Sequence, residues 1–343
     1  MAQGYATETD QEGGPVSGGP GGRFRLRLPH SLLGSGIWRR GLVLAAVAIL
    51  LALLMLLHSH IPNTVGNLGS LIETFLPWCG LLVPLLLIGA VVRRSASAVV
   101  ALVLPTVVWF NLFGGLLLDR TGPGGDLTVA THNVNAENPD PTGTARDVAA
   151  SGADVVALQE LAPAAVPVYK KVLAATYPYH SVQGTVGLWS KYPMRGTKSV
   201  DIKLGWVRAL RTEISTPAGV VAVYEAHLPS VRVKLNAGFT ASERDHSADA
   251  LGQAIRREPQ RRVVLLGDLN GTMNDRALKG VTAQMRSTQG AAGSGFGFSW
   301  PAAFPMARID QIMVRDVEPV TSWTLPRTGS DHLPVAAKIR IGH

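Results

Sequence analysis

Six short apolar runs in the later part of this sequence carry a carboxylate, an amide or an imidazole at or beside one end. The groups are Asn133, Glu160, His227, Asp268 with Asn270, Asp310, and Asp331 with His332. Burying such side chains is costly unless they are paired or bind a cation. If strands of one sheet bring these ends to a single edge, their oxygen atoms would form a site for a hard divalent cation, with two imidazoles beside it.

Most of these groups also have a structural explanation when each is taken alone. The run GDLN at 267–270 is typical of an Asx turn, Asn133 could cap a strand, and Glu160 could pair with an arginine. His227 alone favours a buried, hydrogen-bonded histidine. Asp310 is different, because an acid inside an apolar strand is poorly explained without a cation or an imidazole beside it.

The groups lie in an α/β pattern that covers residues 127–343. Gly and Pro turns separate short β-branched runs, which predict strands, from amphipathic stretches, which predict helices. The predicted strands are LTVATHN, DVVALQE, VGLWS, VRALRTEI, VVAVYEAH, RRVVLLGDLN, IDQIMV and PVAAKI, and the predicted helices lie near 145–150, 164–175, 242–257 and 275–284.

The apolar residues are concentrated before this pattern begins. The chain has 343 residues, 46% hydrophobic and 16% charged, and its mean hydropathy is +0.19. This is too apolar for an ordinary soluble protein, and the single cysteine, Cys79, excludes a disulfide scaffold. Uncharged runs at about 41–57, 75–92 and 96–118 are each long enough to cross a hydrocarbon core of about 30 Å as a helix.

The basic residues around these runs predict their orientation. Five arginines precede the first run, the loop at 58–74 has no Lys or Arg, and the next loop has Arg93 and Arg94. The positive-inside rule therefore predicts a cytoplasmic N-terminus and, after three crossings, an extracytoplasmic C-terminal domain in the cytoplasmic membrane.

The predicted organisation thus has four parts. Residues 1–40 form a disordered, basic cytoplasmic segment, 41–118 form three transmembrane helices, 119–126 form a tether, and 127–343 form the extracytoplasmic domain. An eight-residue tether spans at most about 27 Å, which holds the domain close to the bilayer. Of the +8 net charge, the domain carries 24 basic and 18 acidic residues, or +6, scattered without a strong nucleic-acid footprint.

The order of the motifs resembles the endonuclease/exonuclease/phosphatase superfamily, the deoxyribonuclease I-like metal-dependent phosphoesterases. Asn133, then QE, HLP, GDLN, RIDQI and SDH follow one another along the chain, with SKYP at 190–193. The resemblance covers 127–343 and implies an α/β four-layer sandwich, in which two packed mixed sheets are flanked by helices. It also implies a hydrolase acting on phosphate ester or phosphoanhydride bonds. HLP stands where the abasic-site endonuclease branch usually carries Tyr, which argues against DNA repair.

The resemblance also implies a role for each polar group. Three residues would hold or help to hold Mg²⁺ or Mn²⁺: Asn133, Glu160 and Asp331. Asp268 would orient or deprotonate the attacking water and Asn270 would position it, while Asp310 would fix the tautomer of His332. His332 would contact the phosphate and transfer protons, and His227 would donate to a phosphoryl oxygen or leaving group. Which residue is the general base stays open.

Basic residues near these groups could bind a second phosphate. The candidates are Arg208, Arg211 and Arg232, and a solvated basic face is the alternative for each of them. No pattern in the sequence predicts the oligomeric state.

Three transmembrane helices joined to an outer phosphoesterase domain resemble the VanJ-type teicoplanin-resistance proteins of actinomycetes. That resemblance implies dephosphorylation of undecaprenyl pyrophosphate, a polyprenyl lipid carrier, and a role in glycopeptide resistance. A tether also raises the effective concentration of substrates confined to the same membrane. The alternatives are an extracellular nuclease, a phospholipase C or sphingomyelinase-like phosphodiesterase, and a non-catalytic module that binds lipid pyrophosphate.

Overall fold

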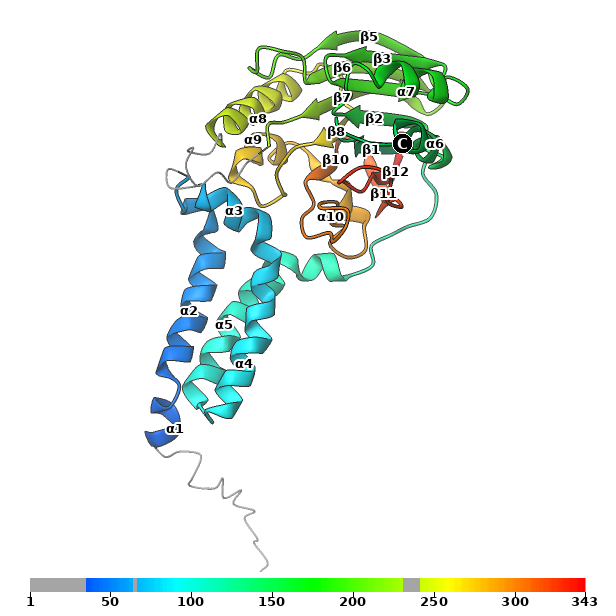
Figure 1. Cartoon of the computed structure of the whole chain (residues 1–343). Coiled ribbons are helices and arrows are strands. Elements are labelled where there is room, and N and C mark those ends of the chain that lie inside the picture. The colour runs from blue at the N-terminus through cyan, green and yellow to red at the C-terminus, as the bar shows by residue number, and fades with distance from the viewer. Residues whose placement is uncertain (1–34, 64–66, 231–240, 343) are drawn as a thin grey trace, which may run out of the picture.

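The chain folds into a bundle of apolar helices and an α/β domain that sits on one end of the bundle. Figure 1 shows the computed structural model, which describes residues 35–63, 67–230 and 241–342. The helical bundle comprises residues 35–117 and the α/β domain residues 127–342. Most of the predicted N-terminal segment 1–40 lies outside the described residues.

The bundle is built from helices joined by short 3-10 turns. They are α1 (Ser35–Arg39), α2 (Leu42–Leu57), η2 (His58–His60), α3 (Leu68–Phe75), η3 (Leu76–Leu81), α4 (Leu82–Val92), α5 (Ala96–Phe113) and η4 (Gly114–Leu117). Within the described residues, three helical stretches are long and apolar enough to cross a membrane: Leu42–His60, Leu68–Val92 and Ala96–Leu117. The second begins earlier than the predicted run, because α3 adds polar residues that are buried against the α/β domain.

Small residues bring the bundle helices close together. Ala48 of α2, Ala90 of α4 and Ala98 of α5 are buried in one cluster, and side chains of this size allow a close approach of helix backbones. Many large apolar side chains of the same helices point outward, including Leu50, which is 63% exposed. Apolar surface of this kind, carried by helices of spanning length, is expected for helices that face lipid.

The α/β domain contains two six-stranded mixed sheets. One sheet has the order β11-β12-β1-β2-β4-β3 and the other β5-β6-β7-β8-β10-β9. The strands are β1 (Leu127–Asn133), β2 (Val155–Gln159), β3 (Tyr179–Gln183), β4 (Val186–Ser190), β5 (Met194–Ser199), β6 (Ala209–Thr216), β7 (Gly219–His227), β8 (Val263–Asp268), β9 (Arg286–Ser287), β10 (Asp310–Arg315), β11 (Glu318–Thr324) and β12 (Val335–Arg340).

The two sheets pack face to face and helices cover their outer faces. Side chains such as Val129 and Leu188 from one sheet meet Val223 and Leu266 from the other in a fully buried core. Two helices, α6 (Pro141–Ala150) and α7 (Val166–Leu173), pack on the first sheet. The second sheet is covered by α8 (Ala241–Arg256), η5 (Arg276–Leu278) and α9 (Lys279–Thr282), and α10 (Thr288–Ala292) follows β9. This arrangement confirms the predicted four-layer fold.

Every strand predicted from the sequence is present, and the four that were not predicted are the edge strands. These are β3 and β11 at the borders of one sheet, and β5 and β9 at the borders of the other. An edge strand has a partner on one side only and buries less of its surface, so its sequence need not be apolar. The run MRGTKS of β5, for example, is partly or fully exposed at every position.

The Glu73–Arg276 ion pair and a hydrogen bond from Arg244 join the α/β domain to the bundle. Glu73 of α3 accepts a hydrogen bond from Arg276 Nε at 3.0 Å, and Arg244 of α8 contacts Asp275 at 2.6 Å. Arg244 also donates to the side-chain oxygen of Ser70 at 3.1 Å. We call Glu73, Arg244, Asp275 and Arg276 the junction cluster.

The predicted tether is bonded to the α/β domain along its length. The backbone N–H of Arg120 donates to Gly293 O at 3.2 Å, and that of Gly122 donates to Val320 O at 2.7 Å. Together with the junction cluster, these bonds hold the domain in one orientation on the bundle.

Candidate active site

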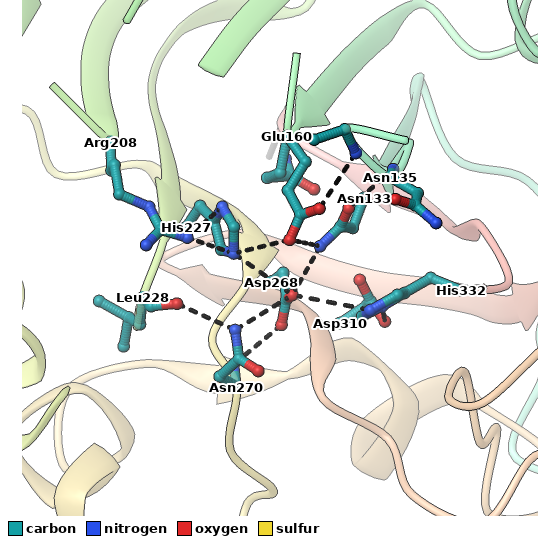
Figure 2. Close-up of polar contacts among 12 residues, drawn as sticks. Asn133, Asn135, Glu160, Arg208, His227, Leu228, Asp268, Asn270, Asp310 and His332 are labelled. Atoms are coloured by element: carbon teal, nitrogen blue, oxygen red, sulfur yellow. Dashed lines mark hydrogen bonds and ion pairs between the residues drawn. The ribbon is translucent and has the colours of Figure 1, made fainter. Parts of the chain in front are cut away.

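The strand registers bring the predicted polar groups to one edge of the sandwich. In the parallel pair β7 and β8, His227 lies opposite Asp268, and in the antiparallel pair β8 and β10, Asp268 lies opposite Asp310. In the other sheet, Asn133 at the end of β1 lies opposite Gln159, the residue before Glu160. Both sheets therefore contribute side chains to one cluster, which Figure 2 shows.

Asp268 lies at the centre of this cluster (Figure 2). Its carboxylate accepts hydrogen bonds from the Asn133 side chain at 3.0 Å and from the backbone N–H of Asn270 at 2.9 Å. His227 Nε2 lies 3.7 Å and His332 Nε2 4.0 Å from the Asp268 Oδ2 atom. Burial and the charge of Asp310 raise the pKa of Asp268 to about 7, so near neutral pH this carboxyl can bind or release a proton.

Glycine at position 267 allows β7 and β8 to approach each other closely beside Asp268. Its φ is +154° and a Cβ atom would lie 1.9 Å from the Ala226 carbonyl oxygen. A larger residue would push β8 away from β7 and separate His227 from Asp268.

Asp310 and His332 form a second pair within the cluster. His332 Nδ1 lies 2.9 Å from Asp310 Oδ2, and the Ser299 hydroxyl donates to the same oxygen at 2.6 Å. Burial opposes a charged imidazole, but the attraction of Asp310 and Asp268 outweighs it and raises the pKa of His332 to about 10. His332 is therefore an imidazolium at neutral pH, able to donate to an anionic substrate from Nε2.

His227 has the opposite electrostatic environment. It is buried, contacts the Arg208 guanidinium, and lies 3.6 Å from Glu160 Oε1 (Figure 2). Burial, Arg208 and His332 together lower its pKa well below the ordinary value. The cluster thus contains one charged imidazole, which can donate a proton, and one neutral imidazole, which can accept one.

Glu160 and Asn270 adopt strained backbone conformations at the site. Their φ angles are +57° and +46°, in the left-handed region that non-glycine residues seldom occupy. Hydrogen bonds hold both residues in place: Glu160 Oε2 accepts from Ala136 N at 3.2 Å, and Asn270 Nδ2 donates to Leu228 O at 2.9 Å. The strain is consistent with side chains that are positioned for a function.

The side chains of Asn133, Glu160 and Asp268 fit a divalent cation. The Asn133 amide donates to Glu160 Oε1 at 3.1 Å and to Asp268 Oδ2 at 3.0 Å, so this amide lies between the two carboxylates. Asp268, Asp310 and His332 also offer ligand atoms within 4.8 Å of one another. A bound ion would neutralise phosphate charge and polarise the ester.

Of the other four predicted groups, two lie apart from this centre, one lies beside it and one is outside the described residues. Asp331 is exposed, although its charge contributes to the raised pKa of His332. Arg211 is buried in ion pairs with Glu258 and Glu213, at 2.6 and 2.8 Å, so its guanidinium is engaged away from the cluster. Arg208 lies beside the site, where its guanidinium contacts the His227 ring (Figure 2). Arg232 lies outside the described residues.

Three site residues were not predicted from the sequence. Ser299 binds Asp310, Ser330 donates to the Asn133 carbonyl oxygen at 2.7 Å, and Arg244 donates to the Asn270 carbonyl oxygen at 2.9 Å. Ser330 is the first residue of the SDH motif, which could have indicated it. Ser299 and Arg244 carry no local signal, because they reach the site only through the tertiary fold.

Comparisons with known proteins agree with this geometry. A profile of the endonuclease/exonuclease/phosphatase family matches residues 130–332, which include every polar group of the cluster. The chain belongs to this family. Its members are metal-dependent hydrolases that act on phosphate esters, and the chain is therefore one of these enzymes. No curated protein sequence matches the chain.

Solved structures with the same fold come from diverse organisms. A functionally unknown conserved protein of Enterococcus faecalis is 15% identical (TM-score 0.53; 62% of this chain and 99% of that chain). D. rerio TDP2 complexed with a single-strand DNA product is 20% identical (TM-score 0.53; 62% and 98%). The mannosyl-6-phosphatase Bt3783 of Bacteroides thetaiotaomicron is 16% identical (TM-score 0.51; 62% and 99%). At these identities the similarity shows the fold alone.

Proposed function

We propose that this protein is a membrane-anchored phosphatase that removes phosphate from undecaprenyl pyrophosphate at the outer face of the cytoplasmic membrane. One observation carries the proposal. Arg244 donates to Ser70 in the apolar bundle and to the carbonyl oxygen of Asn270 in the active site. The loop that begins at Asp268 and contains Asn270, which we call the catalytic loop, is therefore bonded to the end of the bundle. A lipid phosphate would lie at this end.

The orientation of the bundle is part of the proposal. The α/β domain sits at the end where α2 is followed by α3, and α1 lies at the opposite end (Figure 1). Arg39 ends α1, and Arg93 follows α4 and donates to the Arg40 carbonyl oxygen, so these arginines lie at the α1 end; a surplus of arginine is characteristic of cytoplasmic loops. With this orientation the active site lies outside, on the side where lipid carriers are left after their cargo is transferred.

The fold itself is compatible with other phosphate esters. Similar structures include a DNA-bound TDP2 and a sugar phosphatase, so a nuclease and a phospholipase C-like phosphodiesterase are the competing enzymes. The direct bonds between active site and bundle favour a lipid, because a soluble substrate does not require the site to be held at a membrane. Three membrane spans with an outer phosphoesterase domain also resemble the VanJ-type proteins, which supports a role in teicoplanin resistance.

The test is phosphate release by the purified full-length protein in detergent. Undecaprenyl pyrophosphate with Mg²⁺ or Mn²⁺ should yield inorganic phosphate, and Asp268→Asn should abolish the release while the protein remains folded. Asp201→Asn, at an exposed residue with a 69% accessible side chain, is the matched control and should keep full activity. Robust cleavage of plasmid DNA without release from the lipid would overturn the proposal in favour of a nuclease.

Two cellular measurements complete the test. Expression in a susceptible actinomycete should raise the teicoplanin concentration that inhibits growth, and Asp268→Asn should remove the effect. A periplasmic-type phosphatase reporter fused after His343 should be active. Activity of a second kind of reporter, one that works only in the cytoplasm, at the same fusion point would contradict the outward orientation.

A further inference from the structure

An aromatic cavity lies between the apolar helices and the α/β domain. It has a volume of about 440 Å³ and is lined by Trp78 of η3, Thr106, Trp109 and Phe110 of α5, and Phe296 and Phe298 of the domain. Volumes of this size are typical of small-molecule sites. Two of the three spanning stretches, Leu68–Val92 and Ala96–Leu117, and the catalytic domain therefore contribute to one apolar space.

The walls of this cavity are held in fixed positions. The indole N–H of Trp78 donates to Met306 O and that of Trp109 donates to Pro77 O, each at 2.8 Å. The Phe298 ring stacks on Trp78 at 5.8 Å and on Phe296 at 5.1 Å between ring centroids. Because the polar atoms of the tryptophans are already bonded, the cavity presents almost purely apolar surface. Its occupant must be apolar too.

A second cavity, with more polar groups in its lining than the first, shares Pro77, Phe296 and Phe298 with it, and we call it the polar cavity. It has a volume of about 350 Å³, and Arg308 and Gln311 of the α/β domain are among its lining residues. The two cavities meet at these three shared residues, the first among the bundle helices and the second against the α/β domain.

Arg308 in the polar cavity has unused hydrogen-bonding capacity. The residue is 6% exposed, and its Nη1 donates to Gly297 O at 2.8 Å. Its Nε and Nη2 have no hydrogen-bond partner among the described residues. A buried guanidinium with unpaired N–H groups is costly, and an anion with two oxygens would satisfy it in the bidentate manner that arginine adopts with phosphate.

We propose that the two cavities bind a phosphate-bearing lipid, with the part of its hydrocarbon chain nearest the head group in the aromatic cavity and the head group against Arg308. This inference rests on the proposed function, since it identifies the place where the enzyme holds its lipid. An apolar chain and an anionic head joined in one molecule match the two adjoining cavities.

The polar cavity lies directly behind the catalytic loop. Its lining includes Thr272 and Met273, which follow Asn270, and the Gln311 side chain donates to Gly271 O at 3.3 Å. Arg308 precedes Asp310 by two residues on the same segment. A lipid held on Arg308 is therefore next to the loop that positions Asp268 and Asn270.

Binding to the full-length protein in detergent tests the inference directly. The probe is undecaprenyl monophosphate, followed by native mass spectrometry, with undecaprenol as the same chain without the phosphate. Thr106→Phe should fill the aromatic cavity and weaken binding of both lipids at least tenfold. Val107→Phe is the matched control, because Val107 lies on the same helix and is 59% exposed on its outer side. It should bind as the wild type does.

The polar cavity is tested in the same experiment. Arg308→Gln should weaken binding of the monophosphate at least tenfold and leave binding of undecaprenol nearly unchanged. Arg261→Gln, at a guanidinium that is 89% exposed, is the control for loss of one positive charge. If Thr106→Phe does not fold, Val83→Phe on the facing helix fills the same cavity. Wild-type binding by a folded cavity-filling variant, or by Arg308→Gln, would overturn the inference.

Phosphate release separates this inference from the proposed function. If the wild type binds the monophosphate in the cavities but releases no phosphate from undecaprenyl pyrophosphate, the lipid site stands and the proposed substrate is wrong. If the wild type releases phosphate and Thr106→Phe does so equally well, the proposed function stands and the lipid site is wrong.

Discussion

Two buried polar clusters lie close together in this protein, and they differ in how their charges are balanced. In the junction cluster each carboxylate has a guanidinium: Asp275 contacts Arg244, and Glu73 contacts Arg276. In the active site, by contrast, Glu160 and Asp268 lie beside the His227 imidazole, and Asp310 pairs with the His332 imidazole. A balanced cluster can join two parts of a protein, whereas an excess of carboxylates requires a further cation.

The two clusters also differ in whether their side chains can exchange protons with a substrate. In the junction cluster the guanidinium groups form ion pairs with the carboxylates of the same cluster. The active site shifts the pKa of Asp268 to about 7 and that of His332 to about 10, which leaves groups able to exchange protons with a substrate. Arg244 connects the clusters, because it donates to the Asn270 carbonyl oxygen. The stable cluster thus positions the reactive one.

The largest expected effect comes from breaking the pair of Asp310 and His332 in the active site. Asp310→Asn should lower kcat for phosphate release by about 10²–10⁴-fold, because His332 loses the carboxylate that keeps it charged and oriented. Glu213→Gln makes the same acid-to-amide change at a carboxylate outside the site and should retain kcat. A decrease of less than threefold for Asp310→Asn would show that His332 acts without this partner.

Removing the guanidinium of the junction should act mainly on stability. Arg244→Met leaves the Asp275 carboxylate buried without its partner, which should lower the free energy of unfolding by about 3–5 kcal/mol. Chemical denaturation in detergent measures the loss, and kcat should fall as well because Asn270 loses its support. The double variant Arg244→Met with Asp275→Leu should recover most of the stability. If the double variant is as unstable as Arg244→Met, charge balance is not what the junction supplies.

A divalent cation should distinguish the two clusters. Mg²⁺ at 100 times its dissociation constant should stabilise the protein by about 2.7 kcal/mol, seen as a higher temperature of thermal unfolding that EDTA reverses. Glu160→Gln should abolish this increase, because Glu160 is one of the two carboxylates that converge on Asn133. Glu73→Gln, in the junction, should retain it. An equal loss in both variants would contradict a specific ion site at Glu160.

The last effect concerns the pH dependence of stability without metal, and it is the smallest over a single pH unit. The folded-state pKa of His332 is raised from 6.5 to about 10, so its contribution to stability is complete below pH 6.5 and is lost as the pH rises to about 10. Stability should therefore fall by about 1.4 kcal/mol per pH unit in this window. His332→Gln should reduce this slope, and His246→Gln, at an exposed histidine, should not. A slope that His332→Gln leaves unchanged would contradict the raised pKa.

The sequence predicted the central strands and the polar groups at their ends because both leave local patterns. A buried strand such as VVALQ is apolar except at its last residue, and a carboxylate that follows it directly is conspicuous. The edge strands left no such pattern. Arg211 also shows this limit, because its place beside an apolar strand suggested a phosphate contact, whereas the fold pairs it with Glu258.

By itself the sequence determined the three apolar runs, the α/β class and the types of residue in the active site, since hydropathy and strand periodicity are properties of neighbouring residues. The tertiary structure alone decided which groups meet. Asn133 contacts Asp268 across 135 positions, and Arg276 contacts Glu73 across 203. Such contacts depend on how the two sheets pack and how the domain sits on the bundle, and no local periodicity encodes them.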